Sequence, residues 1–218
     1  MSKYTQKELA QFIDHTNLSP VATYDDIKKL CDEALTYEFK AVCINPYYVK
    51  FAKNILQNSN VLVCTVIGFP LGMNTLESKI FEAKNAVENG ADEIDMVINE
   101  AELKAGNVDY CVNEINEIKK VIGNKTLKVI VETSQLNDSQ KILAANIILD
   151  SNAEFIKTST GFIGEGAKIE DIQKWKEILG NKKLIKAAGG IRTNNDFIKF
   201  IEIGCDRIGS SKGVEIIK

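Results

Sequence analysis

The feature that most constrains the fold is a regular alternation between short apolar runs and longer amphipathic stretches. The apolar runs are AVCI near residue 41, VLVCTVI near 61, EIDMVI near 93, LKVIVE near 127, EFIK near 154, LIKAA near 184 and DRIG near 206. Their richness in Val, Ile and Leu predicts buried β-strands. Successive runs begin 20 to 34 residues apart. Each gap therefore has room for one helix, which is typical of a parallel sheet.

Helix start and stop signals lie in these gaps. Thr23 and Asp26 form the pattern of a capping box before IKKLCDEAL, and the stretch 76–87 ends at an Asn-Gly pair. A further short strand over 12–15 brings the number of βα units to eight. Eight units in 218 residues predict one α/β domain spanning 1–218, a closed (βα)8 TIM barrel. An open, doubly wound sheet is the alternative.

Composition and charge exclude several classes of function. The chain has 27 Lys and Arg against 30 Asp and Glu, so its net charge of -3 disfavours nucleic acid as a partner. The N-terminal segment is too polar for a signal peptide, and the apolar run 61–73 is too short and too interrupted to span a bilayer. We expect a cytoplasmic protein that binds neither nucleic acid nor membrane.

Cysteine and histidine usage limits the chemistry further. The five cysteines are widely spaced without a CxxC motif, which predicts buried free thiols rather than disulfides. His15 is the single histidine, so a three-histidine or HExxH zinc site cannot be built. We expect neither a metal nor a cofactor. Catalytic groups of an enzyme of this kind would be Lys, Asp, Glu, Tyr or Cys.

Charged residues inside otherwise apolar strands are the informative exceptions. They are Asp95, Glu132, Lys157 and Lys186, and strand alternation points all four into the barrel. A structural ion-pair cluster is one interpretation, because two carboxylates balance two ammonium groups. The functional interpretation is that one lysine, helped to lose its proton by the other, attacks a carbonyl carbon and forms an imine.

Glycine and serine cluster after the last three strands. Gly161, Gly164 and Gly166 follow Lys157, Gly189 and Gly190 follow Lys186, and Gly209 with Ser210 and Ser211 follows the last strand. Backbone N–H groups there, with Arg192, are suited to hold a phosphate. Plain strand-to-helix turns are the alternative. A nucleotide P-loop is not predicted, because Ser210 stands where that motif requires lysine.

Seven segments, in order over nearly the whole chain, resemble the deoxyribose-phosphate aldolase family. They are DHT at 14–16, VCINP at 42–46, EIDMVIN at 93–99, KVIVET at 128–133, FIKTSTGF at 155–162, KAAGGIRT at 186–193 and DRIGSS at 206–211. The resemblance implies a (βα)8 barrel that reversibly cleaves 2-deoxy-D-ribose 5-phosphate into D-glyceraldehyde 3-phosphate and acetaldehyde without a metal. It implies Lys157 as the Schiff-base lysine, Lys186 as the lysine that favours its deprotonation, and Asp95 as proton donor and acceptor with Lys186.

The same resemblance implies roles at the substrate. Asp14, Cys43 and Thr160 correspond to pocket positions, although a buried apolar filler is an equal interpretation of Cys43. The phosphate site corresponds to Gly161, Gly189, Gly190, Arg192, Gly209, Ser210 and Ser211. The implied partners are small phosphosugars and aldehydes, and a homodimer is the commonest default assembly.

Three departures from the family pattern stand out. Lys212 replaces a serine and either adds charge at the phosphate or faces solvent. The segment GEGAK places Glu165 and Lys168 near the barrel mouth. The sequence ends at EIIK without the tyrosine tail of some members, so we expect slower enamine protonation or another proton donor.

Two alternatives to this activity stay open at the level of sequence. One is a related lysine aldolase that uses a different phosphorylated acceptor. The other is a non-catalytic phosphosugar-binding barrel in which the charged cluster is structural.

Overall fold

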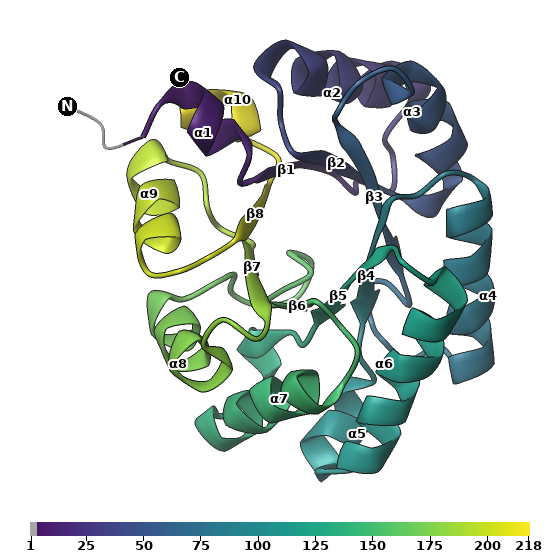
Figure 1. The fold of residues 1–218 in the computed structure, drawn as a ribbon, viewed down its shortest axis with the longest axis vertical. Helices are drawn as coiled ribbons and strands as arrows, with labels where there is room; N and C mark the ends of the chain where they lie inside the picture. The colour runs from purple at the N-terminus through teal and green to yellow at the C-terminus, as the bar shows by residue number, and fades with distance from the viewer. Residues whose placement is uncertain (1–3) are drawn as a thin grey trace.

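A computed structural model describes residues 4–218, and a closed barrel of eight parallel strands lies at its centre (Figure 1). The strands are β1 (Ile13–Asn17), β2 (Ala41–Ile44), β3 (Leu62–Ile67), β4 (Glu93–Val97), β5 (Thr126–Ile130), β6 (Phe155–Lys157), β7 (Leu184–Ala188) and β8 (Arg207–Ser210). They pair in sequence order, and β8 pairs with β1 to close the barrel. The predicted α/β fold, a (βα)8 barrel, is confirmed, and the open sheet is not formed.

Helices surround the barrel (Figure 1). They are α1 (Gln6–Ala10), α2 (Tyr24–Tyr37), α3 (Val49–Leu56), α4 (Leu76–Glu88), α5 (Glu100–Ala105), α6 (Val108–Ile122), α7 (Asp138–Asp150), α8 (Ile169–Leu179), α9 (Asn194–Glu202) and α10 (Gly213–Ile217), with single 3-10 turns at Pro46–Tyr48 and Thr133–Gln135. The predicted capping box is present at α2, because Thr23 and Asp26 each accept a hydrogen bond from the other's backbone N–H. No helix within residues 4–218 is long and apolar enough to cross a membrane.

One gap between strands differs from the prediction of a single helix. The segment between β4 and β5 holds both α5 and α6. Gly106 ends α5 in the left-handed region at φ 77°, and the side chain of Asn107 caps α6 by accepting from the N–H of Tyr110. Glycine at a helix end and asparagine at the next helix start are the sequence signals that mark this break.

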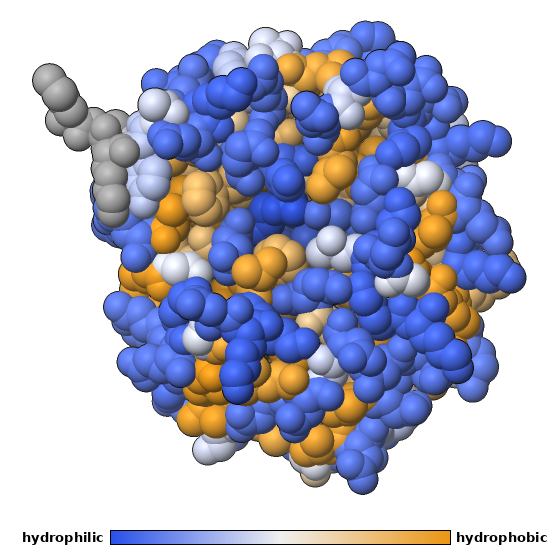
Figure 2. All heavy atoms as spheres, in the orientation of Figure 1, coloured by the Kyte–Doolittle hydropathy of each residue, from blue (hydrophilic) through white to orange (hydrophobic). Residues whose placement is uncertain are grey.

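Strand alternation separates two layers of packing. Side chains such as Ile94, Met96, Val129 and Ile156 face the helices and belong to the large apolar core. A smaller apolar cluster packs separately from that core: Leu18, Ala41, Cys43, Cys64 and Val66. All five cysteines are buried and free, as predicted. Figure 2 shows hydrophilic residues gathered at the hollowed centre of the barrel, with hydrophobic patches around them.

Candidate active site

Seven charged side chains lie inside the barrel. They are Asp14 on β1, Glu93 and Asp95 on β4, Lys128 on β5, Lys157 on β6, Lys186 on β7 and Arg207 on β8. We call these seven residues the barrel ion cluster. Each is at most 5% exposed. Because an isolated buried charge is strongly destabilising, these groups must serve as one another's partners.

The strand register places these charges side by side. Asp95 is the register partner of Lys128 on the neighbouring strand, and Lys186 is the partner of both Lys157 and Arg207. Register partners in a sheet project to the same face. The alternation seen in the sequence therefore placed Asp95, Lys157 and Lys186 correctly inside the barrel.

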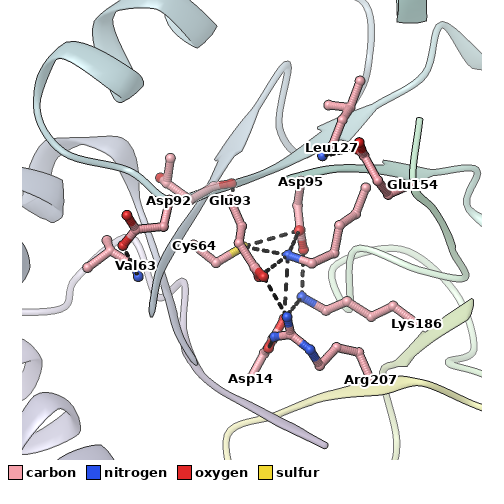
Figure 3. A network of polar contacts seen from close by, with 12 residues as sticks. Asp14, Val63, Cys64, Asp92, Glu93, Asp95, Leu127, Glu154, Lys186 and Arg207 are labelled. Atoms are coloured by element: carbon pink, nitrogen blue, oxygen red, sulfur yellow. Dashed lines mark hydrogen bonds and ion pairs between the residues drawn. The ribbon is translucent and has the colours of Figure 1, made fainter. Parts of the chain in front are cut away.

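The Asp95 carboxylate is at the centre of the cluster, and its two oxygens have different partners. Oδ2 accepts from Lys157 Nζ at 2.7 Å and from Lys186 Nζ at 2.8 Å. Oδ1 accepts from Lys128 Nζ at 2.9 Å and from the thiol of Cys64 at 3.1 Å. Figure 3 shows Asp95 and Lys186 facing one another, with Cys64 beside them. One carboxylate thus connects three lysines from three strands.

The rest of the cluster extends this network through Asp14 and Glu93. Asp14 forms short ion pairs with both Lys186 and Arg207, and the Arg207 side chain also donates to Glu93 Oε1 at 2.5 Å (Figure 3). Glu93 Oε2 lies 2.6 Å from Lys128 Nζ. The carboxylates therefore alternate with cations around the interior, so that each cation contacts at least one carboxylate.

These contacts determine the charge states of the buried groups. Burial opposes ionisation of Asp95, but Lys128, Lys157 and Lys186 together hold its pKa well below the ordinary value. Burial opposes ionisation of Asp14 in the same way, and Arg207 and Lys186 lower its pKa. Burial would lower the pKa of Lys186, yet Asp14 and Asp95 raise it. At neutral pH Lys186 is thus a fixed positive charge next to Lys157.

One member of the barrel ion cluster reaches an open cavity. The cavity has a volume of about 520 Å³. Within residues 4–218, Lys157 is the cluster member that lines it, although only 3% of Lys157 is exposed. Asp14, Asp95 and Lys186 are fully buried behind it. A molecule in the cavity would therefore meet the amine of Lys157 first.

The predicted phosphate-site residues line the same cavity. Its wall includes Gly161, Gly189, Gly190, Arg192, Gly209, Ser210 and Ser211, together with Thr160. Gly161, Gly189 and Gly190 have φ values of 82°, 85° and 78°, a region that favours glycine. A Cβ atom on Gly166 would lie 2.1 Å from the carbonyl oxygen of Gly189. These glycines therefore allow the loops after β6 and β7 to touch and to shape the cavity wall.

Four predicted residues lie away from the cavity surface or are already hydrogen-bonded. Asp14 and Cys43 are fully buried and do not line it. Thr160 lines it, but its hydroxyl donates to Glu132 Oε2 at 2.5 Å. Ser210 lines it as well, and its hydroxyl donates to the carbonyl oxygen of Ile191 at 2.9 Å. The Ser210 hydroxyl also accepts from the N–H of Lys212, so it already has two hydrogen-bond partners.

The expectation for Glu132 was wrong. Strand β5 ends at Ile130, and Glu132 adopts a left-handed backbone with φ 49°. Its carboxylate accepts from the N–H and the hydroxyl of Thr160 and takes no part in the barrel ion cluster. Strand alternation does not extend past the end of a strand, so it could not predict the direction of this side chain.

The two departures in the loops lie outside the lining of this cavity. Lys212 is exposed and its ammonium group lies 3.1 Å from Glu215, outside the lining of the cavity. Glu165 and Lys168 form an exposed ion pair at 2.7 Å and line a neighbouring cavity on the other side of the Gly189–Gly190 turn.

Sequence reasoning missed three members of the cluster: Glu93, Lys128 and Arg207. Glu93 and Lys128 share the inward parity of Asp95 and Glu132 in their own runs, so consistent use of alternation would have found them. Arg207 opens the last run and is the register partner of Lys186. Glu93 and Arg207 each open their strand, where a charge resembles an ordinary flanking residue, whereas Lys128 lies in the middle of β5.

Two sets of buried donors have the composition of a metal site. Sγ of Cys43, Sγ of Cys64 and an oxygen of Asp95 lie within 4.8 Å of one another, as do donor atoms of Asp14, Cys64 and Glu93. Lys128 Nζ already contacts Cys64 Sγ at 3.2 Å as well as Glu93 and Asp95. An ammonium group thus occupies the position that a cation would take among these donors.

Comparisons with known proteins agree with this architecture. The sequence pattern of the DeoC/LacD family aldolases matches residues 8–215. The chain is 59% identical over 212 residues to the deoxyribose-phosphate aldolase of Malacoplasma penetrans, covering 97% of this chain and 96% of that protein. It is 56% identical to the enzyme of that name from Caldicellulosiruptor saccharolyticus, covering 98% of both.

A solved structure gives the same result. The deoxyribose phosphate aldolase from Aeropyrum pernix, described as tetrameric, superposes with a TM-score of 0.91 at 32% identity, covering 98% of this chain and 91% of that one. The match extends over the strands that carry the barrel ion cluster and over the loops that line the cavity. The chain belongs to the DeoC/LacD family of aldolases.

Proposed function

We propose that this protein reversibly cleaves 2-deoxy-D-ribose 5-phosphate into D-glyceraldehyde 3-phosphate and acetaldehyde through a Schiff base on Lys157, as a step in the breakdown of deoxyribonucleosides. One observation carries the proposal: Lys157 is the cluster member that reaches the cavity, and the wall of that cavity holds the glycine-rich turns and Arg192. A nucleophilic amine and a phosphate-binding wall share one space. The relatives of this chain are named for the same substrate.

The charge count of the cluster supports Lys157 as the nucleophile. Three carboxylates, of Asp14, Glu93 and Asp95, face four basic side chains. With an uncharged amine at Lys157, three carboxylates face three cations. Its deprotonation therefore leaves no buried carboxylate without a cation. Lys157 pairs with a single carboxylate, that of Asp95, whereas Lys128, Lys186 and Arg207 each pair with two or more.

The first half of the proposed reaction forms the imine and breaks the carbon–carbon bond. The open-chain aldehyde enters with its phosphate against Arg192 and the glycine turns. Nζ of Lys157 adds to the C1 carbonyl, and loss of water gives a cationic imine. A base then removes the proton from the 3-hydroxyl. The C2–C3 bond breaks, its electron pair flows into the imine, and D-glyceraldehyde 3-phosphate leaves behind an enamine on Lys157.

The second half returns the enzyme to its starting state. Protonation of the enamine at C2 gives the acetaldehyde imine, and water releases acetaldehyde from Lys157. Asp95 and Lys186 are the groups we assign to proton transfer, because Asp95 Oδ2 lies 2.7 Å from Lys157 Nζ and 2.8 Å from Lys186 Nζ. Both are buried behind Lys157, so a water molecule must carry the proton to the carbon.

The test is turnover of 2-deoxyribose 5-phosphate compared with 2-deoxyribose lacking the phosphate. We expect the phosphorylated sugar to have a kcat/KM higher by about 100-fold or more, because charge-assisted contacts to a phosphate contribute strongly. Arg192→Ala should reduce that preference to below about tenfold, mainly through KM. Equal turnover of both sugars would contradict the assignment of the phosphate wall. The predicted homodimer can be checked on the same protein by its mass in solution.

A further inference from the structure

Lys128 is a fully buried lysine that the proposed reaction does not use. It lies on β5 as the register partner of Asp95, and its side chain is 0% exposed. Its ammonium group lies 2.6 Å from Glu93 Oε2, 2.9 Å from Asp95 Oδ1 and 3.7 Å from Asp14 Oδ2. It also donates to Cys64 Sγ at 3.2 Å. Three strands, β1, β3 and β4, therefore supply its partners.

Because Lys128 binds one oxygen of Asp95, the two oxygens have different partners. Lys128 and Cys64 bind Oδ1, while Lys157 and Lys186 share Oδ2. A carboxylate with one oxygen held cannot rotate without breaking those contacts. The oxygen that remains, Oδ2, is the one that faces the proposed nucleophile and its neighbouring lysine.

We propose that Lys128 is a positioning residue that binds Oδ1 of Asp95 and thereby keeps Oδ2, the oxygen assigned to proton transfer, directed at Lys157 and Lys186. This inference rests on the proposed function. Lys128 does not line the cavity, so it acts through Asp95 and not on the substrate.

The electrostatics of the cluster support this role. The positive charge of Lys128 lowers the pKa of the Asp95 carboxyl group, together with the charges of Lys157 and Lys186 and the hydrogen bond from Lys157. Burial would lower the pKa of Lys128 itself, but the carboxylates of Asp95, Glu93 and Asp14 raise it well above the ordinary value. Its charge is therefore permanent, unlike that of Lys157, whose nitrogen becomes an amine and an imine during the proposed reaction.

Ionisable groups face Asp95 from several strands of the barrel. Lys157, Lys186 and Lys128 face it from β6, β7 and β5, and Cys64 faces it from β3. Asp14 on β1 acts on it from farther away, and Asp95 in turn influences the Cys43 thiol on β2. Burial raises the pKa of Cys64 well above the ordinary value, so its thiol stays protonated and donates to Asp95.

The test compares Lys128→Met with Lys141→Met. Methionine keeps most of the length of the side chain and removes the charge. Lys141 is the matched control, because it is 13% exposed, pairs with Asp171 at 2.8 Å and lies outside the barrel between α7 and α8. Both variants lose a largely buried ion pair, so general destabilisation should affect both. The measurements are kcat and KM for 2-deoxyribose 5-phosphate as functions of pH.

We expect Lys128→Met to lower kcat at neutral pH by about tenfold or more and to change KM by less than about threefold. The acid limb of its kcat profile should move to higher pH by about one unit or more. A positive charge within hydrogen-bonding distance lowers a carboxyl pKa by about that amount, so loss of Lys128 should raise the pKa of Asp95. Lys141→Met should keep the wild-type acid limb. Lys128→Arg restores a positive charge and should return the limb close to its wild-type position.

Each outcome supports or overturns the inference. An acid limb in Lys128→Met that coincides with wild type, in protein shown to be folded, would overturn it while leaving the proposed function intact. If Lys128→Met fails to fold, Lys128→Arg decides, since a raised acid limb in that charge-retaining variant would contradict the role. Failure of the wild-type protein to turn over the sugar would instead remove the proposed function, and this inference with it.

Discussion

Within residues 4–218, lysine is buried in two places, and the two places differ in how their charges are balanced. Lys79 on α4 pairs with Glu114 on α6 at 2.6 Å, and both side chains are completely buried. Lys79 also donates to the carbonyl oxygen of Val97, and Glu114 accepts from the N–H of Asn99. One cation meets one carboxylate there, and the remaining contacts satisfy their other hydrogen-bonding groups.

The barrel ion cluster differs from this pair in its ratio of basic to acidic side chains and in its contact with a cavity. Four basic side chains share three carboxylates, and one of the four, Lys157, reaches a cavity. The comparison teaches that burial of a charged residue does not by itself mark a reactive site. A reactive site is marked instead by one basic side chain more than the carboxylates can pair with, placed where a ligand can contact it.

The largest expected effect is the loss of the reactive group itself. Lys157→Arg keeps a positive charge but cannot form an imine, so we expect turnover to fall by at least about 1,000-fold. The variant should still bind the phosphorylated sugar, which equilibrium dialysis with labelled substrate can measure. Turnover close to that of wild type would show that Lys157, like Lys79, is a structural and not a reactive lysine.

A smaller effect on rate is expected from Lys186→Leu. Without the fixed charge of Lys186, Oδ2 of Asp95 pairs with Lys157 alone while Lys128 still binds Oδ1, and the nearby positive charge that favours loss of the proton is gone. We expect the rate at pH 7 to fall by about 100-fold and to recover partly as the pH is raised toward 9. A rate that does not change with pH over that range would reject this role for Lys186.

The smallest effect on chemistry is expected from Lys79→Met. Removing one partner of a fully buried pair leaves the Glu114 carboxylate without its cation, which should cost about 3–5 kcal/mol of unfolding free energy. Denaturant unfolding measures that loss. At a temperature where the variant is folded, kcat should stay within about threefold of wild type. A loss of turnover as large as that of Lys186→Leu would show that the helical pair also serves the reaction.

The sequence predicted the fold well, because the information needed was local. Apolar runs, their spacing, the capping box of Thr23 and Asp26 and the Asn-Gly helix end each depend on a few neighbouring residues. The break between α5 and α6 was missed although Gly106 and Asn107 mark it. We expected one helix between each pair of successive strands, and that expectation overrode the local signal.

The candidate site could be predicted only in part. Alternation found Asp95, Lys157 and Lys186, but it could not show that Oδ1 and Oδ2 of Asp95 would bind different lysines. That division depends on the register of four strands and on side-chain rotamers, which are set by closure of the barrel. Glu132 was misplaced because its left-handed backbone lies beyond the end of its strand.

The central claim is that Lys157 forms the imine, and borohydride reduction in the presence of acetaldehyde tests it most directly. Reduction converts an imine into a stable secondary amine, which intact mass and peptide mapping can locate. We predict one two-carbon adduct on Lys157, retained in Lys79→Met and absent from Lys157→Arg. Folded wild-type protein with no adduct on Lys157, or with the adduct on Lys186 or Lys128, would contradict the account.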